Sequence, residues 1–432
     1  MFLLMKNYNK INNFYVEEKE QALIKHIIPQ YYVDHNDVEV DYALRFLQNE
    51  LNGLLGSFVN GGFSYKGYML HPLVSDVSKE NIENIKKLRK IIVFLGKNGY
   101  NFSKSIKTYR NNINSKNFAI ILSSLYQDLY SIKFKKIKRV IKNKCLKFNV
   151  SNFNKFDYEY LKPVIELSNY ANKKLKQFLS GFYLHGSIAT NDFIKGFSDL
   201  DTVSIVSKET INNPDLLLEL RNRMYYARSF FYRIDPLQHH GSIILSKYEL
   251  ENYCQSYFPI EIFKYAKSFF EDRIKDFRVR NSSSESLVKM FWFVCYFRRL
   301  HTERKYNLNS YDTKMLLHSI TLFPSLYLQT KGRFVYKKFS FNLAKRDFSK
   351  EIWKVIDDVS VIRKKWKNIT VLPSIKMISR FNPLFFYQIN FRAADIFNGI
   401  KKLNNIDTKQ LIEGMHKLSE EAWNNVKHNV KI

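Results

Sequence analysis

The stretch HGSIATNDFIKGFSDLD, residues 185–201, carries the features that decide the fold. A short apolar run, Phe182–Leu184, precedes it, and a second, Thr202–Val206, follows the last acidic residue. Both runs predict strands, and no turn-forming residue interrupts the second one. We therefore expect a strand, a Gly-Ser turn into a short helix, and a second strand that opens with two carboxylates.

Asp199 and Asp201 stand two residues apart at the start of this second predicted strand. Alternate residues of a strand point to the same face, so we expect the two carboxylates to project together, about 7 Å apart along the strand. Two such charges repel each other unless a cation lies between them, and Mg²⁺ prefers one or two carboxylates together with phosphate oxygens. The pair predicts a site for a metal-bound triphosphate; a solvated turn that opens a strand is the alternative.

Gly186 and Ser187 have the properties of a phosphate-binding turn. Gly186 allows the backbone to turn and to approach a phosphate closely, because it has no Cβ. Ser187 offers a hydroxyl and a backbone N–H at the expected start of a helix, where unpaired N–H groups and the helix dipole favour an anion. Eleven residues separate Ser187 from Asp199. We expect phosphates bound at this turn to lie over the carboxylate pair.

This arrangement resembles the nucleotidyltransferase superfamily, which has the fold of DNA polymerase beta. The family pattern is an apolar residue, Gly and then Gly or Ser, a spacer, and two acids around an apolar residue in a strand; Leu184–Ser187 and Asp199–Val203 match it. The family also has a third carboxylate on a later strand. Asp235, in the strand-like run 231–237, is the expected third acid, with Asp192 and Glu249 as alternatives. Its position 34 residues after Asp201 resembles the compact small-substrate and toxin-like members.

The resemblance implies transfer of a nucleoside monophosphate from an NTP such as ATP to an acceptor hydroxyl, with release of pyrophosphate. Asp199, Asp201 and Asp235 would be the catalytic residues and the ligands of Mg²⁺, with Mn²⁺ as the alternative metal. In sites of this kind two ions stabilise the attacking and leaving oxygens. Gly186 and Ser187 would bind the β- and γ-phosphates.

Two histidines and two lysines are further candidates. His239 and His240 open the predicted strand 239–245, where adjacent residues face opposite sides, so we expect only one of them to face the site. That histidine would bind phosphate, orient the acceptor or act as a base. The resemblance also implies a helical second domain whose basic residues reach the triphosphate. Lys337 and Lys338 are candidates for this role, and exposed loop lysines are the alternative.

The 432 residues, 45% hydrophobic and 16% aromatic, are enough for two or three domains with a large core. The predicted fold class is α+β. A small mixed sheet forms a nucleotidyltransferase domain over 151–257, between a mostly helical region over 1–150 and a helical bundle over 258–432. Apolar spacing predicts helices over 41–55, 79–95, 117–141, 158–179, 215–228, 284–303, 311–331, 349–366 and 407–427.

The formal net charge is +29, which predicts attraction to polyanions such as nucleic acid, nucleotides or a membrane surface; a general compositional bias toward Lys is the alternative. The densest basic run, 133–144, has helical apolar spacing and predicts a basic helix. Three widely spaced cysteines give neither a disulfide framework nor a zinc pattern, which fits a reducing cytoplasm. No apolar segment approaches the ~20 residues of a membrane span.

The sequence leaves the acceptor open. A small hydroxylated molecule is the favoured acceptor. A protein side chain or a tRNA end, modified by a toxin-like transferase, is one alternative, and a second nucleotide is another. A non-enzymatic interpretation is a basic nucleic-acid-binding scaffold with a degenerate nucleotidyltransferase domain, whose binding would depend steeply on salt.

Overall fold

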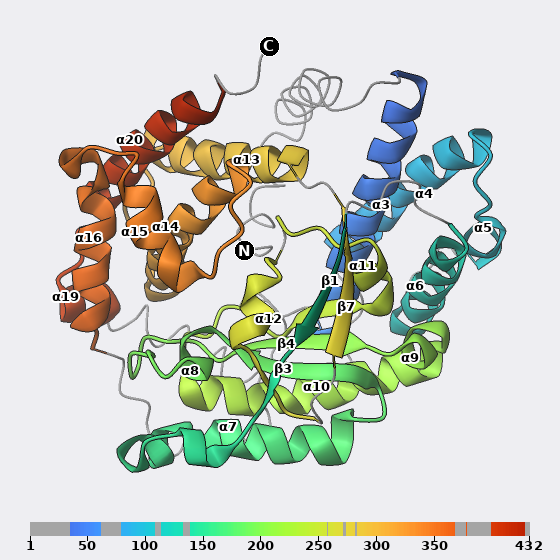
Figure 1. Cartoon of the computed structure of the whole chain (residues 1–432), viewed down its shortest axis with the longest axis horizontal. Helices are drawn as coiled ribbons and strands as arrows, with labels where there is room; N and C mark the ends of the chain where they lie inside the picture. The colour runs from blue at the N-terminus through green and yellow to red at the C-terminus, as the bar shows by residue number, and fades with distance from the viewer. Residues whose placement is uncertain are drawn as a thin grey trace.

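The computed structural model describes residues 35–61, 79–108, 114–132, 139–256, 258–270, 274–280, 283–367, 377 and 399–427. Helices surround a mixed five-stranded sheet and a separate two-stranded ribbon (Figure 1). The expected α+β class with a small mixed sheet is therefore confirmed. None of the helices among these residues combines the length and apolar character that a membrane crossing requires.

The sheet has the strand order β2-β6-β3-β4-β5. The central strand β3 pairs antiparallel with β4 and with β6, whereas β4 and β5 run parallel. Almost every residue of β3 and β4 is buried, because helices and loops cover both faces of the sheet. The strands are β2, Leu146–Lys147; β3, Leu179–His185; β4, Asp201–Val206; β5, Ile243–Ser246; and β6, Lys267–Ser268.

The predicted basic helix over 133–144 is wrong in its described part. Residues Arg139–Lys144 form strand β1, which pairs antiparallel with β7, Ile274–Val279; residues 133–138 lie outside the described residues. The predicted helix 117–141 likewise ends early, because α6 stops at Tyr130. A short run that mixes Lys with apolar residues fits the period of a helix and that of a strand. Here the pairing with β7 favours the strand.

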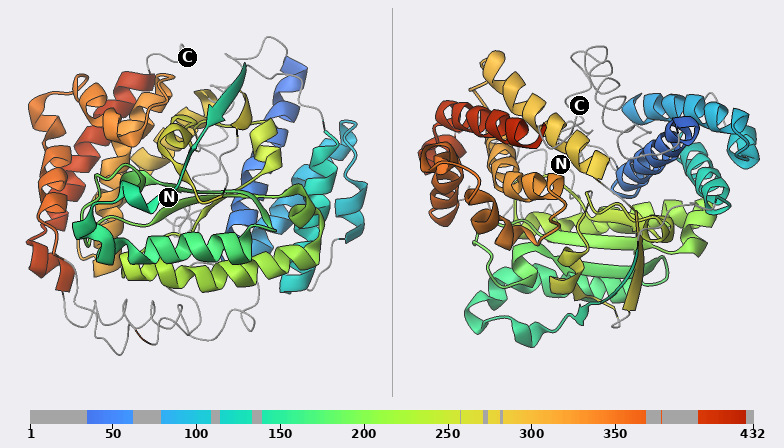
Figure 2. Two further views of the ribbon diagram at one scale, coloured as in Figure 1. Left: turned by 60° about the horizontal axis from the view of Figure 1, so that its bottom comes forward. Right: turned by 45° about the horizontal axis from the view of Figure 1, so that its top comes forward.

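Among the described residues, helices α3 to α6 precede the sheet, and α7 and α10 lie side by side beneath it (Figures 1 and 2). Buried side chains from all of these helices except α5, together with Phe102, form one apolar cluster with those of β3 and β4. The predicted boundary at residue 150 therefore does not separate two hydrophobic cores. The helices are α3, His35–Val59; α4, Lys79–Lys97; α5, Ser103–Thr108; α6, Ser115–Tyr130; α7, Tyr158–Tyr170; and α10, Pro214–Ile234.

Helix α10 continues through the segment that was expected to be a strand carrying Asp235. Its buried residues recur at helical spacing up to Ile234, and Asp235 is its C-cap, with extended backbone angles of φ −133° and ψ 107°. Pro236 follows, and the residue before a proline is driven out of the helical region. The aromatic run at 230–232 resembles a strand in composition, but the 3.6-residue period of the whole helix overrides it.

The C-terminal helices form a second apolar cluster, which also takes in Phe197 and Leu237 from the loops beside the sheet. The four helices predicted here from apolar spacing are confirmed as α13, α14, α16 and α20, and α15 was not predicted. These helices are α13, Ser283–Thr302; α14, Ser310–Thr330; α15, Lys337–Lys345; α16, Lys350–Lys364; α19, Gly399–Asn404; and α20, Thr408–Lys427. Shorter helices near the sheet are α8, Gly186–Ala189; α9, Lys208–Asn212; α11, Lys247–Glu251; and α12, Glu261–Tyr265.

Candidate functional site

The Gly-Ser turn has the geometry that its sequence predicts. Strand β3 ends at His185, and α8 begins at Gly186, whose φ is +73°. A Cβ atom at Gly186 would lie only 2.1 Å from Oδ2 of Asp201. Glycine is therefore required both by the left-handed backbone and by the close approach of a carboxylate. Ser187 follows in the first turn of α8, and both residues line the cavity described below.

Asp199 and Asp201 lie at the beginning of β4, as expected, although the strand starts at Asp201 and Asp199 belongs to the preceding loop. Leu200, between them, is fully buried. Its backbone is held on both sides by one amide, because Gln238 accepts from its N–H at 3.0 Å and donates to its carbonyl at 3.2 Å. With Leu200 anchored in the core, the two carboxylates line the same cavity.

The parallel pairing of β4 with β5 brings the two histidines to these carboxylates. The register pairs Val203 of β4 with Ile243 of β5. The segments that precede the two strands therefore also lie next to each other, and this places His239 and His240 beside the two aspartates. The histidines lie in the loop before β5 and not in the strand itself. The expectation that only one of them faces the site is therefore wrong, because strand alternation does not apply to a loop.

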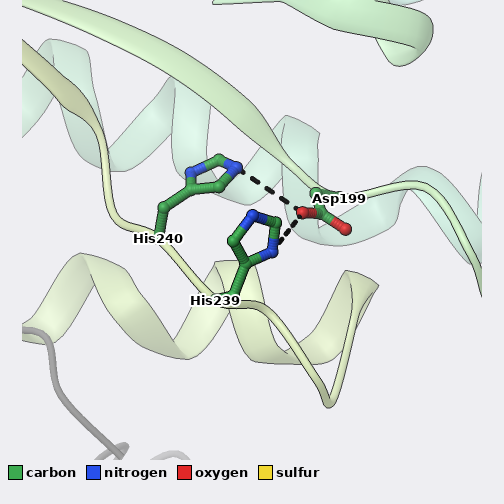
Figure 3. A group of neighbouring side chains, drawn as sticks. All are labelled: Asp199, His239 and His240. Carbon is green, nitrogen blue, oxygen red and sulfur yellow. Dashed lines mark ion pairs between the residues drawn. The ribbon is translucent and has the colours of Figure 1, made fainter. Parts of the chain in front are cut away.

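Both histidines contact Asp199 (Figure 3). Nδ1 of His239 lies 2.9 Å from Oδ2 of Asp199, and Nε2 of His240 lies 3.5 Å from the same oxygen. His240 Nε2 is also 3.2 Å from Oδ1 of Asp201. One imidazole nitrogen thus lies between the two carboxylates, where a cation is expected.

The other oxygen of Asp199 faces two residues that sequence reasoning missed. Lys314 Nζ and His318 Nε2 lie 3.2 and 3.3 Å from Oδ1 of Asp199. They are four residues apart and so share one face of α14. The only sign of them in the sequence is a Lys and a His at helical spacing within the predicted helix 311–331. Which partner they meet depends on how α14 docks against the sheet.

Asp235 reaches this group from the opposite side. Its carboxylate is completely buried, and Lys314 Nζ lies 2.5 Å from its Oδ2. Burial raises the pKa of Asp235 to about 7, against the lowering effect of Lys314. Asp235 is not among the described residues that line the cavity. Lys314 therefore lies between Asp199 and the predicted third acid.

The two alternatives to Asp235 lie elsewhere. Asp192 lines the cavity and pairs with Lys338 at 3.3 Å. Glu249 caps α11 through a capping box with Ser246 and accepts a hydrogen bond from Tyr126 at 3.2 Å. Glu249 is therefore a structural residue at the junction of the N-terminal helices and the sheet.

The charges around Asp199 compensate for its burial. Burial favours the neutral acid, but His318, Lys314 and His239 hold the pKa of Asp199 well below its usual value. Burial also lowers the pKa of His239 far below its ordinary value, which favours the neutral ring. His240 behaves in the opposite way, because the two carboxylates outweigh burial and raise its pKa to about 10.

The carboxylates of Asp199 and Asp201, with the imidazoles of His239, His240 and His318, form part of the floor of a cavity of about 940 Å³. Residues of helix α3 and of helices α13 to α16 line it; these helices lie above the sheet, with α3 on one side and the C-terminal helices on the other (Figure 2). The C-terminal wall is basic: Lys337, Lys338, Lys345, Arg363 and Lys364 all line the cavity.

Lys337 and Lys338 open helix α15 and do not lie in a loop. Lys337 is partly buried; burial and the neighbouring Arg363 lower its pKa to about 8. The side chain of Lys338 is 48% exposed and pairs with Asp192. Of the two predicted lysines, Lys337 is the one whose charge interacts with Asp199 and Asp201.

Three donor atoms of the site are close enough to share a metal ion. Oδ2 of Asp199, Nδ1 of His239 and Nε2 of His240 belong to a group whose ligand atoms all lie within 4.8 Å of one another. Comparisons with protein-family models, with curated proteins and with solved structures find no match to this chain. Its function is therefore inferred from the site itself.

Proposed function

We propose that this protein is a metal-dependent nucleotidyltransferase, which moves a nucleoside monophosphate from an NTP to an acceptor hydroxyl and releases pyrophosphate. The observation that supports it most is the close approach of the Asp201 carboxylate to Gly186. Oδ2 of Asp201 lies 2.1 Å from the position that a Cβ at residue 186 would occupy. A turn suited to phosphate and a carboxylate pair suited to a metal thus meet on the floor of one cavity. The same combination underlies the resemblance to the nucleotidyltransferase superfamily.

Each residue has a defined part in this reaction. The backbone N–H groups and hydroxyl at Gly186 and Ser187 would bind the phosphates, with Lys337 facing them from α15. Asp199 and Asp201 would hold the divalent ion, Mg²⁺ or Mn²⁺, which neutralises phosphate charge when bound. The acceptor oxygen bonds to the α-phosphorus as the bond to pyrophosphate breaks. The hydroxyl proton passes to Asp201, whose side chain is 27% exposed.

Asp235 is a weaker candidate for a metal ligand than the sequence suggested. Its carboxylate contacts Lys314 and does not line the cavity. We assign it to positioning Lys314, which in turn holds Asp199. The ammonium group of Lys314 thereby provides a positive charge between Asp199 and Asp235. In a two-metal site, a metal ion would provide this charge.

The cavity favours a small acceptor. Sites for small molecules have volumes of about 300–1,000 Å³, and this cavity, at about 940 Å³, lies at the upper end of that range. It has room for an NTP and a small hydroxylated molecule together. A protein or a tRNA is the alternative acceptor, and it would insert only a side chain or an end into the cavity. The size of the labelled product distinguishes these acceptors from a small molecule.

The test is pyrophosphate release by the purified chain with each of the four NTPs, Mg²⁺ or Mn²⁺, and a cell extract as the source of acceptor. We expect release with at least one NTP, and we expect Asp201→Ala to abolish it. Asp347→Ala is the matched control, because Asp347 forms a partly exposed pair with Lys331 and does not line the cavity. Full activity of Asp201→Ala would exclude the proposed site.

A further inference from the structure

We propose that Asp199, His239 and His240 bind one first-row transition-metal ion, of the class of Zn²⁺, Co²⁺ or Mn²⁺, through one oxygen and two imidazole nitrogens. This deepens the proposed function by narrowing its metal from Mg²⁺ or Mn²⁺ to Mn²⁺ or another transition metal, and it rests on that function for what the metal does. The metal binding itself rests on the geometry of the three side chains alone.

The spacing of the donor atoms fits one shared ion. Bonds of about 2.0–2.1 Å in a tetrahedral site place neighbouring ligand atoms about 3.3 Å apart. Oδ2 of Asp199 lies 2.9 Å from Nδ1 of His239 and 3.5 Å from Nε2 of His240. Both histidines come from one loop and the aspartate from the neighbouring one, so the parallel strand pair fixes the three donors relative to each other.

The hydrogen bonding of His240 leaves its Nε2 in need of a cation. Its Nδ1 lies 2.9 Å from the carbonyl oxygen of Gly241, and because a carbonyl only accepts, Nδ1 must donate. Nε2 then faces carboxylate oxygens of Asp199 and Asp201. Either a proton or a metal ion has to lie between a ring nitrogen and two carboxylates, because their lone pairs repel one another.

Buried polar atoms of the same group make ion-pair contacts but no hydrogen bond of good geometry. This holds for Oδ2 of Asp199 and Nδ1 of His239, which lie 2.9 Å from each other in residues that are at least nine-tenths buried. Buried polar side-chain atoms are normally satisfied. A metal ion held by Oδ2 of Asp199 and Nδ1 of His239 would satisfy both of these atoms at once.

The donor set selects against Mg²⁺. Mg²⁺ takes oxygen ligands and keeps several waters, whereas imidazole suits Zn²⁺ and other transition metals. Three protein ligands leave an open coordination position, as in catalytic zinc sites, and all three of these residues line the cavity. Lys314 and His318 contact the other oxygen of Asp199 and would orient it as outer-shell partners do.

Cobalt binding tests this site directly. The full chain, freed of metal with a chelator, is titrated with Co²⁺ and followed by visible absorbance, and Mg²⁺ is then added in excess. We expect one Co²⁺ per chain, no displacement by a 100-fold excess of Mg²⁺, and binding at least about 10-fold weaker in His239→Ala and in His240→Ala, since loss of even an outer-shell partner weakens metal binding by that factor. His301→Ala and His416→Ala are the controls, because these histidines stack on each other with ring centroids 4.4 Å apart and do not line the cavity.

Undiminished Co²⁺ affinity in the His239→Ala/His240→Ala protein, or displacement by an equal concentration of Mg²⁺, would overturn the site. If the histidine variants fail to fold, pulsed EPR of the Mn²⁺-loaded wild-type chain decides: imidazole nitrogen coupling supports the site, and its absence overturns it. The same preparations are assayed for pyrophosphate. Absence of release from metal-loaded protein would count against the proposed function, whereas release that does not need the histidines would count against this site alone.

Discussion

Gly186 and Asp201 depend on each other at the centre of the site. The glycine adopts φ +73°, and the carboxylate occupies the space that a side chain at position 186 would need. Gly332 offers a natural comparison, because its φ is +71° but no atom lies within 4 Å of a Cβ added there. A substitution at Gly332 therefore causes backbone strain alone, whereas one at Gly186 causes the same strain and also displaces the carboxylate.

We predict that Gly186→Ala abolishes pyrophosphate release, whereas Gly332→Ala keeps it. Both lower the free energy of unfolding by about 1–2 kcal/mol, which is what the left-handed conformation costs a residue with a Cβ. Only the first pushes Asp201 away. Urea unfolding and the pyrophosphate assay measure the two effects, and equal activity of the two proteins would argue against a role for the turn.

Lys314 holds two buried acids, Asp199 and Asp235, and this predicts a large effect on stability. Lys314→Met removes the ammonium group that both buried carboxylates contact, so we expect the free energy of unfolding to fall by about 3–5 kcal/mol. Lys331→Met breaks the partly exposed pair with Asp347 and should change it by no more than about 1 kcal/mol. Denaturant unfolding of the two variants compares them, and equal effects would show that the buried triad is not a coupled unit.

The sequence identifies residues whose chemistry depends on local spacing, and it misses those brought in by packing. Gly186, Asp199 and Asp201 lie within one short stretch, so local geometry alone predicts that they meet. Lys314 is more than a hundred residues away, and its contact with Asp199 depends on the docking of α14. The pairing of Asp235 with a lysine could not be predicted for the same reason.

At the scale of elements, helix α15 decides which basic residue faces the site. Lys337 and Lys338 are adjacent, so on a helix they point in different directions. Both line the cavity, but Lys337 is partly buried, whereas Lys338 is exposed and pairs with Asp192.

We predict that Lys337→Ala weakens NTP binding by about 10-fold or more, the size of a lost hydrogen bond to a charged group, and that Lys338→Ala changes it little. Because the pKa of Lys337 is about 8, the wild-type affinity should fall as the pH rises through that value, and Lys337→Ala should lose this dependence. Calorimetric titration with a non-hydrolysable NTP analogue between pH 7 and 9 measures both. Equal losses in the two variants would point to net charge and not to position.

Glu249, in the capping box of α11, gives stability a pH dependence of known sign. Burial raises its pKa from 4.5 to about 7, so the unfolded chain ionises first as the pH rises. The contribution of the neutral acid is fully present below pH 4.5 and is lost as the pH rises through about 7, by about 3 kcal/mol in total.

Glu249→Gln keeps an acceptor oxygen but cannot ionise. We therefore expect its free energy of unfolding to lack the decrease that ionisation of Glu249 causes in the wild type. The difference in free energy of unfolding between Glu249→Gln and the wild type should shift in favour of the variant by about 3 kcal/mol from pH 4.5 to pH 8. Urea unfolding at both pH values measures it. A difference that does not change with pH would mean that Glu249 ionises normally in the folded chain.

Long elements with a clear period could be predicted, and so could the short strands β3 and β4 on either side of the Gly-Ser turn, whereas composition-biased segments could not. Apolar spacing predicted α13, α14, α16 and α20 correctly, because each buries one stripe over several turns. It failed at β1, where the partner strand β7 decides the structure. It failed again at the end of α10, where an aromatic run looks like a strand although it continues a helix.

At the scale of the whole molecule, the site lies where three parts of the chain meet. The N-terminal helices share the core of the sheet, and the C-terminal helices dock on it through Phe197 and Leu237. Both groups of helices line the cavity above the carboxylates. No local pattern reports how distant helices pack, so the sequence predicted their existence but not this common core or the basic wall.

The net charge of +29 belongs to the whole chain, and some of its basic residues line the same cavity as the carboxylates. Lysine residues placed there suit a triphosphate. A basic scaffold would instead bind nucleic acid over its outer surface, with an affinity that falls steeply with salt, and it would not turn over NTP.

Transfer of isotopic label from NTP to an acceptor tests the proposed reaction most directly. The chain is incubated with a cell extract and with NTP labelled at either the α- or the γ-phosphorus, in wild-type and Asp199→Ala/Asp201→Ala forms. Nucleotidyl transfer predicts α-label in a small product and γ-label in pyrophosphate, both lost in the variant. Label from the γ-position in the product would mean phosphoryl transfer, and no label in any product together with salt-sensitive binding of nucleic acid would mean a scaffold; either result would contradict a nucleotidyltransferase.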